Sequence, residues 1–325
     1  MRFSIENTLV AINKEIESYN FGNEPKNLYE PIEYIMGLGG KRLRPLLTLL
    51  SHNLFSDSFE KVLLPAIGVE VFHNFTLLHD DIMDNAPLRR GKPTVHEKWN
   101  QNVAILSGDV MLVKSYELLL NLEDKFHKKM LSSFNACAAA VCEGQQLDVN
   151  FELSENISLE EYIHMISLKT AALLGFCMEL GAVAAETDEK NINLLKDFGI
   201  NIGIAFQLQD DLLDVYGDKD KFGKKTGGDI LAKKKTFLLI KALEQAKGKD
   251  LELLRNFVKD TAPVSDDQVK MVRKVYDNVN IQEQTQAAIQ DYSERAVNCL
   301  TKVNATLFKK ASLKTFVGKL MVRES

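Results

Sequence analysis

The stretch NINLLKDFGINIGIAFQLQDDLL, residues 191–213, decides the fold class. Its apolar residues recur at helical spacing, as Leu195, Phe198 and Ile202 show with intervals of three and four residues. Residues 110–142 repeat this pattern, and no proline occurs from 94 to 262. Helix interiors exclude proline because it removes a hydrogen-bond donor and clashes with the preceding turn. The sequence therefore predicts an all-α protein, a single-domain bundle (residues 1–325) of about ten or more helices.

The composition is that of an ordinary soluble protein, with 45% hydrophobic residues, 26% charged residues and a net charge of −5. The mildly acidic chain offers no surface to follow a nucleic-acid backbone, so we expect no nucleic-acid partner. Residues 171–185 are the longest apolar stretch, but they are too short to cross a bilayer and include Glu179. We expect a buried helix there and no membrane span.

The chain ends and the cysteines indicate a location. The first residues lack the long apolar core of a secretory signal. The four cysteines include no CxxC pair, and free thiols are typical of a reducing compartment. The sequence therefore predicts a cytoplasmic protein.

Two acidic pentads dominate the search for a functional site: DDIMD at 80–84 and DDLLD at 210–214. On a helix, the first and last aspartates of each pentad lie one turn apart on the same face. Carboxylates so close together raise one another's pKa and call for a compensating cation. Hard oxygen ligands suit Mg²⁺. A single pentad could be a solvated acidic helix end, but two of them, each beside an apolar helix, favour a metal site.

Basic residues accompany both pentads. GGKRLRP (39–45) and RRGKP (89–93) flank the first pentad, and lysines at 224, 225 and 233–235 follow the second. Guanidinium and ammonium groups beside metal-binding carboxylates bind diphosphate oxygens. His73 lies seven residues before Asp80, so it should point to the same side of that helix. The chain has no GxxxxGK[ST], GxSxG or HExxH motif, which argues against a nucleotide-binding P-loop, a serine hydrolase or a zinc protease.

Eight motifs occur in a characteristic order: GGKRLRP (39–45), HDDIMD (79–84), RRGKPTVH (89–96), GQQLD (144–148), KT (169–170), FQLQDDLLD (206–214), GDKDKFGKKTGGDI (217–230) and KKKT (233–236). In these motifs the sequence resembles the trans-isoprenyl diphosphate synthases of the polyprenyl synthetase family, from about residue 30 to 245. The resemblance implies helices around a deep central cavity (the type I isoprenoid synthase fold) and a homodimer. It also implies that isopentenyl diphosphate and an allylic prenyl diphosphate are the substrates, with three Mg²⁺ ions bound.

The resemblance assigns roles residue by residue. The principal metal ligands would be Asp80, Asp84 and Asp210, with Asp81, Asp211, Asp214 and Asp148 in support. The allylic diphosphate would be held by Arg89, Lys169, Lys224 and Lys234. Isopentenyl diphosphate would be held by Lys41, Arg44, His73 and Arg90. Thr170 and Gln207 would face the developing cation. Which of Lys233, Lys234 and Lys235 reaches the site stays open, because this segment is one residue longer than in some relatives.

The implied reaction breaks the allylic C–O bond and joins the resulting carbocation to the double bond of isopentenyl diphosphate. Diphosphate leaves, stabilised by metal, arginine and lysine. Water has to be excluded from the cation. The loop around RRGKP and the segment after Lys221 are our candidates for closing the site.

The residues before the first pentad bear on product length. Phe75, Thr76 and Phe72 stand five, four and eight residues before Asp80. In the family that is resembled, such positions line or floor the pocket for the growing tail. Phe75 with a small Thr76 resembles synthases that make the twenty-carbon geranylgeranyl diphosphate, whereas an aromatic residue at both positions would suggest the fifteen-carbon farnesyl diphosphate. Bulky Phe72 could shorten the pocket. We favour geranylgeranyl diphosphate as the product, with farnesyl diphosphate as the alternative.

Two other functions stay open. A terpene cyclase has a helical bundle and one DDxxD, but it usually carries a different second metal motif. A non-catalytic partner subunit of a prenyl synthase usually lacks one pentad. Both pentads are present here, so we favour the synthase.

Overall fold

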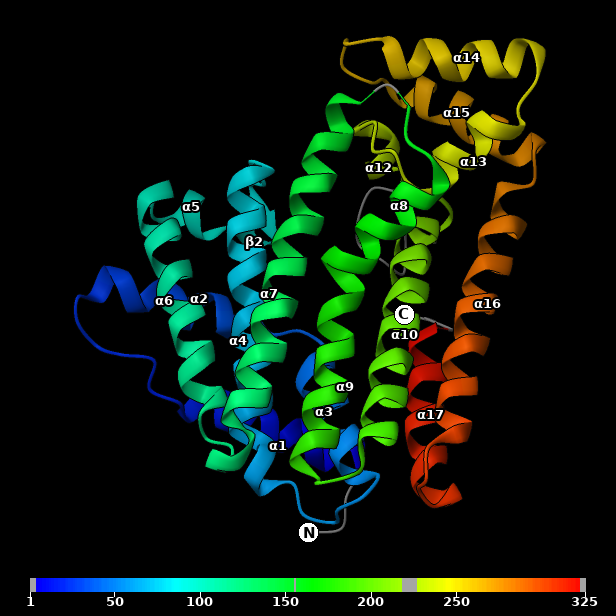
Figure 1. Cartoon of the computed structure of the whole chain (residues 1–325). Helices are drawn as coiled ribbons and strands as arrows, with labels where there is room; N and C mark the ends of the chain where they lie inside the picture. The colour runs from blue at the N-terminus through cyan, green and yellow to red at the C-terminus, as the bar shows by residue number, and fades with distance from the viewer. Residues whose placement is uncertain (1–3, 155, 218–226, 322–325) are drawn as a thin grey trace. The chain divides into compact units, whose positions relative to one another are not determined.

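The protein was analysed as a computed structural model that describes residues 4–154, 156–217 and 227–321. Most of these residues are helical, which confirms the all-α prediction (Figure 1). One short hairpin falls in the segment predicted as a loop, where β1 (Leu88–Arg89) pairs antiparallel with β2 (Lys92–Pro93).

The chain forms two compact units. Unit 1 comprises residues 1–135, 176–193 and 304–309, and unit 2 comprises residues 136–175, 194–303 and 310–325. The expectation of a single domain stays a prediction.

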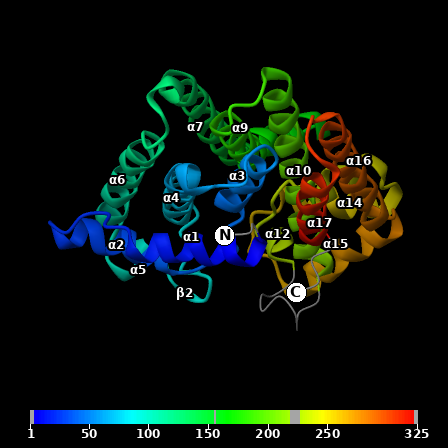
Figure 2. The ribbon, with the colours of Figure 1, turned by 90° about the horizontal axis from the view of Figure 1, so that it is seen from below.

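Unit 1 is built around one helix. Its helices are α1 (Ile5–Ser18), α2 (Lys26–Gly37), α3 (Leu43–Asn53), α4 (Glu60–Met83), α5 (Val95–Lys98), α6 (Gln101–Leu119) and the first part of α7 (Asp124–Leu153). The helix α4 packs against both α3 and α6, as its end-on view in Figure 2 shows. It is apolar on nearly all sides, which is typical of a helix surrounded by others. The polar end of α4 carries the first pentad.

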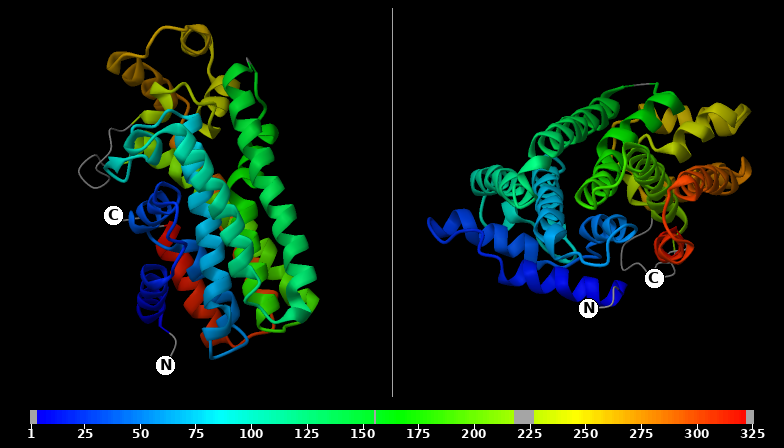
Figure 3. Two further views of the ribbon diagram at one scale, coloured as in Figure 1. Left: turned by 90° about the vertical axis from the view of Figure 1, so that its left-hand side faces the viewer. Right: turned by 60° about the horizontal axis from the view of Figure 1, so that its bottom comes forward.

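Unit 2 holds most of the remaining helices. They are α8 (Leu159–Ile166), the π-helical turn η1 (Ser167–Ala171), the start of α9 (Ala172–Ala184), most of α10 (Glu189–Tyr216), α12 (Gly228–Leu231), α13 (Phe237–Gln245), α14 (Gly248–Lys259), α15 (Asp266–Asn278), α16 (Ile281–Lys302) and most of α17 (Leu307–Met321). The helices α13, α14 and α15 pack against one another, as the two views in Figure 3 allow the reader to follow. A capping box formed by Ser158 and Glu161 begins α8: the Ser158 side chain accepts from the Glu161 amide, and the Glu161 carboxylate accepts from the Ser158 amide.

Two helical stretches, Glu60–Met83 and Leu159–Ala184, are long and apolar enough by composition to cross a membrane. In the most apolar 18-residue window of each stretch, 67% and 72% of the window, respectively, are buried inside the protein. Their apolar character is that of core helices, as the sequence predicted for residues 171–185.

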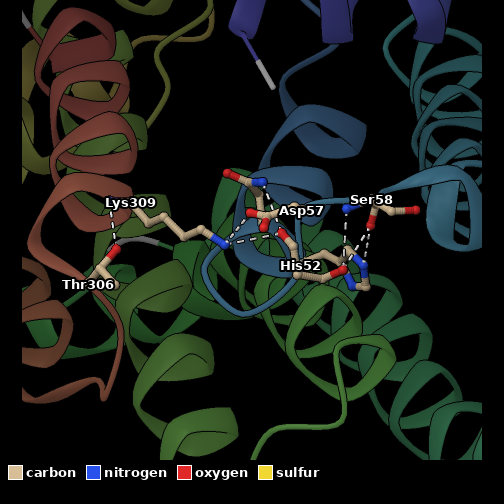
Figure 4. A network of polar contacts seen from close by, with 7 residues as sticks. His52, Asp57, Ser58, Thr306 and Lys309 are labelled. Carbon is tan, nitrogen blue, oxygen red and sulfur yellow. Dashed lines mark hydrogen bonds and ion pairs between the residues drawn. The ribbon is translucent and has the colours of Figure 1, made fainter. Parts of the chain in front are cut away.

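A polar network attaches residues 304–309 to the rest of unit 1 (Figure 4). The ammonium group of Lys309 lies 2.7 Å from Asp57 Oδ1, and the backbone amide of Asn304 donates to Asn191 Oδ1 over 2.8 Å. Nearby, His52 Nε2 lies 2.8 Å from the Ser58 carbonyl oxygen and Nδ1 lies 3.3 Å from that of Gly181. Burial lowers the pKa of His52.

Candidate active site

The first pentad ends α4. Asp80 is partly exposed, Asp81 is only 2% exposed, and Asp84 caps the helix at the surface. Helix α4 therefore presents its carboxylates at different depths. The predicted face shared by Asp80 and Asp84 is the solvent-accessible one.

The β1–β2 hairpin holds Arg89 against this pentad. Arg89 Nε donates to both carboxylate oxygens of Asp81, over 2.9 and 2.8 Å, and Nη2 donates to Oδ1 over 2.7 Å. Arg89, predicted to hold diphosphate, therefore binds one of the predicted supporting metal ligands.

The basic loop between α2 and α3 is anchored by a residue to which sequence reasoning gave no role. Arg42 is 5% exposed and pairs with Glu70 over 3.0 Å. It also donates to the Met36 carbonyl oxygen over 2.7 Å. These contacts fix the position of Arg42 in the loop. On either side of it in the sequence, Lys41 is exposed and Arg44 is partly buried. The polar position of Glu70 inside an apolar helix was the signal that could have revealed the pair.

His73 lies on α4 within a positive environment. Burial lowers its pKa well below the usual value, and Arg44, Arg90 and Arg89 lower it further. Arg90 also donates a hydrogen bond to the Gly39 carbonyl oxygen. Unit 1 thus brings His73 into the positive environment of Arg44 and Arg90, which favours the neutral imidazole, and their role in binding isopentenyl diphosphate stays a prediction. Such an environment favours an anion.

A row of aromatic rings leads from the first pentad into the core of unit 1. The Phe75 ring contacts the His79 imidazole at a centroid distance of 4.8 Å and the Phe72 ring at 5.6 Å. Phe72 in turn packs edge-on against Phe134 at 5.1 Å. Thr76 is partly exposed and donates its hydroxyl proton to the His73 carbonyl oxygen over 2.8 Å.

The second pentad ends α10 in unit 2. Asp210 and Asp214 are partly exposed, whereas Asp211 is 4% exposed. Asp214 accepts a hydrogen bond from the backbone amide of Asp229 over 2.8 Å. Burial, followed by the charge of Asp214, raises the pKa of Asp229 to about 6, while Lys234 acts in the opposite direction. Asp229 stands in the GGDI motif, but sequence reasoning gave it no role.

A π-helical turn presents Lys169 and Thr170. The Lys169 ammonium group contacts Asp148 Oδ2 at 2.6 Å. A Cβ atom on Gly144 would lie 2.3 Å from the Lys169 backbone nitrogen, and one on Gly203 would lie 2.4 Å from the Ala171 Cα atom. Two glycines on α7 and α10 therefore allow both helices to approach the turn. Such π-helical insertions are frequent at functional sites.

Thr170 and Gln207, which share a predicted role, are joined by a hydrogen bond. The Thr170 hydroxyl donates to Gln207 Oε1 over 3.0 Å, and Gln207 Nε2 donates to Asp211 Oδ1 over 3.0 Å. Burial and the charge of Asp229 raise the pKa of Asp211, against the effect of its hydrogen bonds.

The lysines after the second pentad differ in their partners. Lys233 donates to the Asp260 carbonyl oxygen, and Lys235 donates to that of Phe151 over 2.6 Å. The exposed Lys234 is the one whose charge acts on Asp229. Lys224 and the segment after Lys221 lie largely outside the described residues, so the structure gives no test of their predicted roles.

The donor chemistry fits Mg²⁺. Within unit 2, Asp210, Asp214, Asp148 and Asp229 interact through space, and their mutual repulsion raises the pKa of Asp229. A bound cation would relieve this repulsion, and carboxylate oxygens are the ligands Mg²⁺ prefers. In the described part of the chain, no group of three or more His, Cys, Asp or Glu side chains is arranged to hold a metal ion by itself. Mg²⁺ sites of this kind commonly add substrate phosphate oxygens and water to one or two carboxylates.

Comparisons with known proteins agree with this chemistry. The family model described as Polyprenyl synthetase matches residues 25–278. The short chain isoprenyl diphosphate synthase of Methanocaldococcus jannaschii is 42% identical over 257 residues, 77% of each chain. The geranylgeranyl diphosphate synthase of Sulfolobus acidocaldarius is 42% identical over 241 residues, 73% of each chain. A crystal structure of a geranylgeranyl pyrophosphate synthase superposes with a TM-score of 0.94 at 40% identity and covers 99% of this chain and 100% of its own.

Proposed function

Since this chain belongs to the polyprenyl synthetase family and is a prenyltransferase, we propose that it condenses isopentenyl diphosphate with an allylic diphosphate to give geranylgeranyl diphosphate. The observation that carries the proposal is the presence of both carboxylate pentads, each beside cationic side chains, in a chain about 40% identical to geranylgeranyl diphosphate synthases.

The residues of unit 1 suit the binding of isopentenyl diphosphate. His73 is kept neutral by burial and by the neighbouring arginines, so it can accept or donate a hydrogen bond without adding charge. Lys41, Arg44 and Arg90 would supply the positive charge for the diphosphate oxygens. Glu70 and Arg42 hold the loop that carries Lys41 and Arg44.

The residues of unit 2 suit the departure of the allylic diphosphate. As the C–O bond breaks, Lys169 and Lys234 would stabilise the growing negative charge of the leaving group. The oxygen atoms of Thr170 and Gln207 would face the positive carbon. Mg²⁺, on which the family generally depends, would neutralise diphosphate charge when bound to the pentad carboxylates. Three ions are expected from the resemblance.

In unit 1, Arg89 would contribute by exchanging its present partner. It now binds Asp81, and a diphosphate would offer a second acceptor of the same geometry. The RRGKP loop that carries it is our candidate for closing over the substrate.

The aromatic row supports a product limited in length. Phe75 is 9% exposed, while Phe72 and Phe134 are fully buried behind it. A tail that grows along α4 past Thr76 would meet these rings. Farnesyl diphosphate is the alternative product, because Phe72 and Phe75 together could stop the tail one unit earlier.

A homodimer is part of this proposal. Leu106 and Val113 on α6 and Leu120 at its C-cap stand seven residues apart and are 57%, 63% and 47% exposed. A regular apolar stripe on a helix favours packing against another helix. Sedimentation analysis of Val113→Glu against the wild type tests it: we expect the variant to dissociate, whereas an unchanged mass would remove this stripe from the interface.

A cytoplasmic location also belongs to the proposal. None of the four cysteines forms a disulfide in the structure: Cys137 and Cys177 are buried, Cys142 is exposed and Cys299 is partly exposed. Free thiols are typical of a reducing compartment.

Product analysis tests the function directly. The purified protein is incubated with isopentenyl diphosphate, Mg²⁺ and dimethylallyl, geranyl or farnesyl diphosphate in turn, and the products are sized. We expect a twenty-carbon diphosphate whose formation stops with EDTA. A fifteen-carbon end product would support the farnesyl alternative. Cyclic hydrocarbons would identify a terpene cyclase, and no turnover without an added partner would indicate a non-catalytic subunit.

A further inference from the structure

Tyr162 stands outside every predicted site motif, yet it contacts the second pentad. It lies on α8 and is 2% exposed within the core of unit 2, among residues that include Met165, Leu208 and Leu212. Its hydroxyl donates to Asp211 Oδ2. The other oxygen of Asp211 accepts from Gln207 Nε2. A buried phenol thus occupies one side of the carboxylate, and the catalytic glutamine occupies the other.

The hydrogen bonds form a chain with one direction. The Thr170 hydroxyl donates to Gln207, Gln207 donates to Asp211, and Tyr162 donates to Asp211 from the far side. In these bonds Gln207 presents its NH₂ group to Asp211. Its carbonyl oxygen then points to Thr170 and takes the single hydroxyl proton of that residue. The exposed side of Thr170 Oγ1 is left with lone pairs.

This direction matters for a reaction that passes through a carbocation. Oxygen lone pairs that face the positive carbon stabilise it, whereas an N–H or O–H group turned toward it is repelled. If the Gln207 amide were reversed, Thr170 would accept a hydrogen bond from NH₂ and turn its own proton outward. The orientation of the Gln207 amide therefore decides whether Gln207 and Thr170 turn oxygen lone pairs or hydrogen atoms toward the positive carbon.

We propose that Tyr162 is a positioning residue for prenyl transfer, whose hydroxyl holds Asp211 so that Gln207 and Thr170 present oxygen lone pairs to the developing cation. This role rests on the proposed function. Tyr162 itself touches no substrate in this account. Without its hydroxyl, the buried Asp211 loses one of its two donors and can rotate, and Gln207 loses its fixed acceptor.

The test compares Tyr162→Phe with Tyr276→Phe. Tyr276 on α15 is also 2% exposed in unit 2, but it belongs to none of these three hydrogen bonds. For Tyr162→Phe we expect kcat to fall about tenfold, KM values for both substrates to stay within about twofold, and a larger share of prenyl alcohol from water capture. Tyr276→Phe should keep the wild-type kcat and alcohol share.

A double-mutant cycle asks whether Tyr162 acts through Gln207. In a Gln207→Ala background, Tyr162→Phe should cause no further loss of kcat, because the group that it orients is gone. Additive losses would overturn the proposal, as would an equal fall of kcat in Tyr162→Phe and Tyr276→Phe.

A second pair of variants covers the case in which Tyr162→Phe does not fold. Thr170 is partly exposed, so Thr170→Ser and Thr170→Val should fold. Thr170→Ser keeps the hydroxyl and should retain activity within about threefold, whereas Thr170→Val should lose about tenfold or more. Wild-type kcat in Thr170→Val would refute the polarity argument. A wild-type protein with no prenyl transfer would instead refute the proposed function.

Discussion

Arg89 binds Asp81 through both carboxylate oxygens, at nitrogen–oxygen distances between 2.7 and 2.9 Å. The aspartate is almost fully buried, whereas the arginine side chain is 25% exposed. The pair therefore joins the interior of the first pentad to the surface hairpin.

Removal of the guanidinium should destabilise unit 1. In Arg89→Ala, the buried side chain of Asp81 would lose its hydrogen-bonding partner, which costs about 2 kcal/mol after allowance for the solvent exposure of Arg89. Urea denaturation without Mg²⁺ measures this loss. Arg89→Lys keeps the charge but not the paired geometry and should lose less. Equal stability of Arg89→Ala and the wild type would contradict the role of this pair.

The outer aspartates of the pentads should control turnover. Asp80→Ala and Asp210→Ala are each expected to lower kcat by about 10²-fold or more, because charge stabilisation of the leaving diphosphate is lost. Steady-state assays with saturating Mg²⁺ measure the effect. The exposed Asp197 on α10 supplies the matched control, and Asp197→Ala should keep normal turnover. Near-normal turnover in either pentad variant would remove that pentad from the site.

The aromatic row should set the product length. Phe75→Ala removes the ring that packs between His79 and Phe72, so the tail can pass the position where it now stops. We expect products longer by about one or two five-carbon units, because each unit needs roughly the volume of one aromatic ring. Chromatography of the dephosphorylated alcohols measures the distribution. An unchanged distribution would show that Phe75 is only a core residue.

The positions at which α7 and α10 approach the π-helical turn, Gly144 and Gly203, should tolerate no larger residue. Gly144→Ala and Gly203→Ala each place a methyl group less than 2.5 Å from backbone atoms of the turn. We expect a loss of about 3 kcal/mol or more in the free energy of unfolding, or a displaced Lys169 with a higher KM for the allylic diphosphate.

Gly318→Ala is the control for this pair. It lies in α17, and no described atom comes within 4 Å of its added Cβ atom. The alanine should stabilise the helix by up to about 1 kcal/mol. Wild-type stability and KM in both Gly144→Ala and Gly203→Ala would refute the tight packing of the turn.

His52 should make stability depend on pH. Because its pKa is lowered in the folded protein, the unfolded chain binds the proton more strongly. The contribution of neutral His52 to the free energy of unfolding is therefore fully present above the unfolded-state pKa near 6.5. It is lost as the pH drops toward the folded-state pKa, by at most about 1.4 kcal/mol per pH unit. Denaturation at pH 7.5 and 5.5 should show a smaller difference for His52→Gln than for the wild type. His164 is exposed, so His164→Gln should leave the difference between the stabilities at pH 7.5 and 5.5 as it is in the wild type.

Sequence periodicity predicted the helices well, because a helix that buries one face repeats its apolar residues every three to four positions. The capping box at Ser158 is also written locally in the sequence, because Glu161 follows three residues later. The hairpin at 88–93 was missed because each strand is only two residues long.

Roles could be proposed from sequence where the chemistry is written in a motif, as for Asp80 or Lys169, and these roles stay predictions. Arg42, Tyr162 and Asp229 were missed because their roles depend on partners far away in sequence. Tyr162 meets Asp211 across a separation of 49 residues, and no periodic pattern records such a contact. Gly144 belongs to the GQQLD motif, but its contact with Lys169 could not be predicted because it depends on how α7 packs against the π-helical turn.

The attachment of residues 304–309 to unit 1 has a consequence for biosynthesis. Most of unit 1 consists of the first 135 residues, and Lys309 and Asn304 join it from near the end of the chain. Domains tend to fold from the N-terminus while the chain is still being made. Here residues 1–135 cannot acquire these partners until the intervening residues 136–303 have also been synthesised, so until then the apolar helix α4 depends on other contacts within the nascent chain.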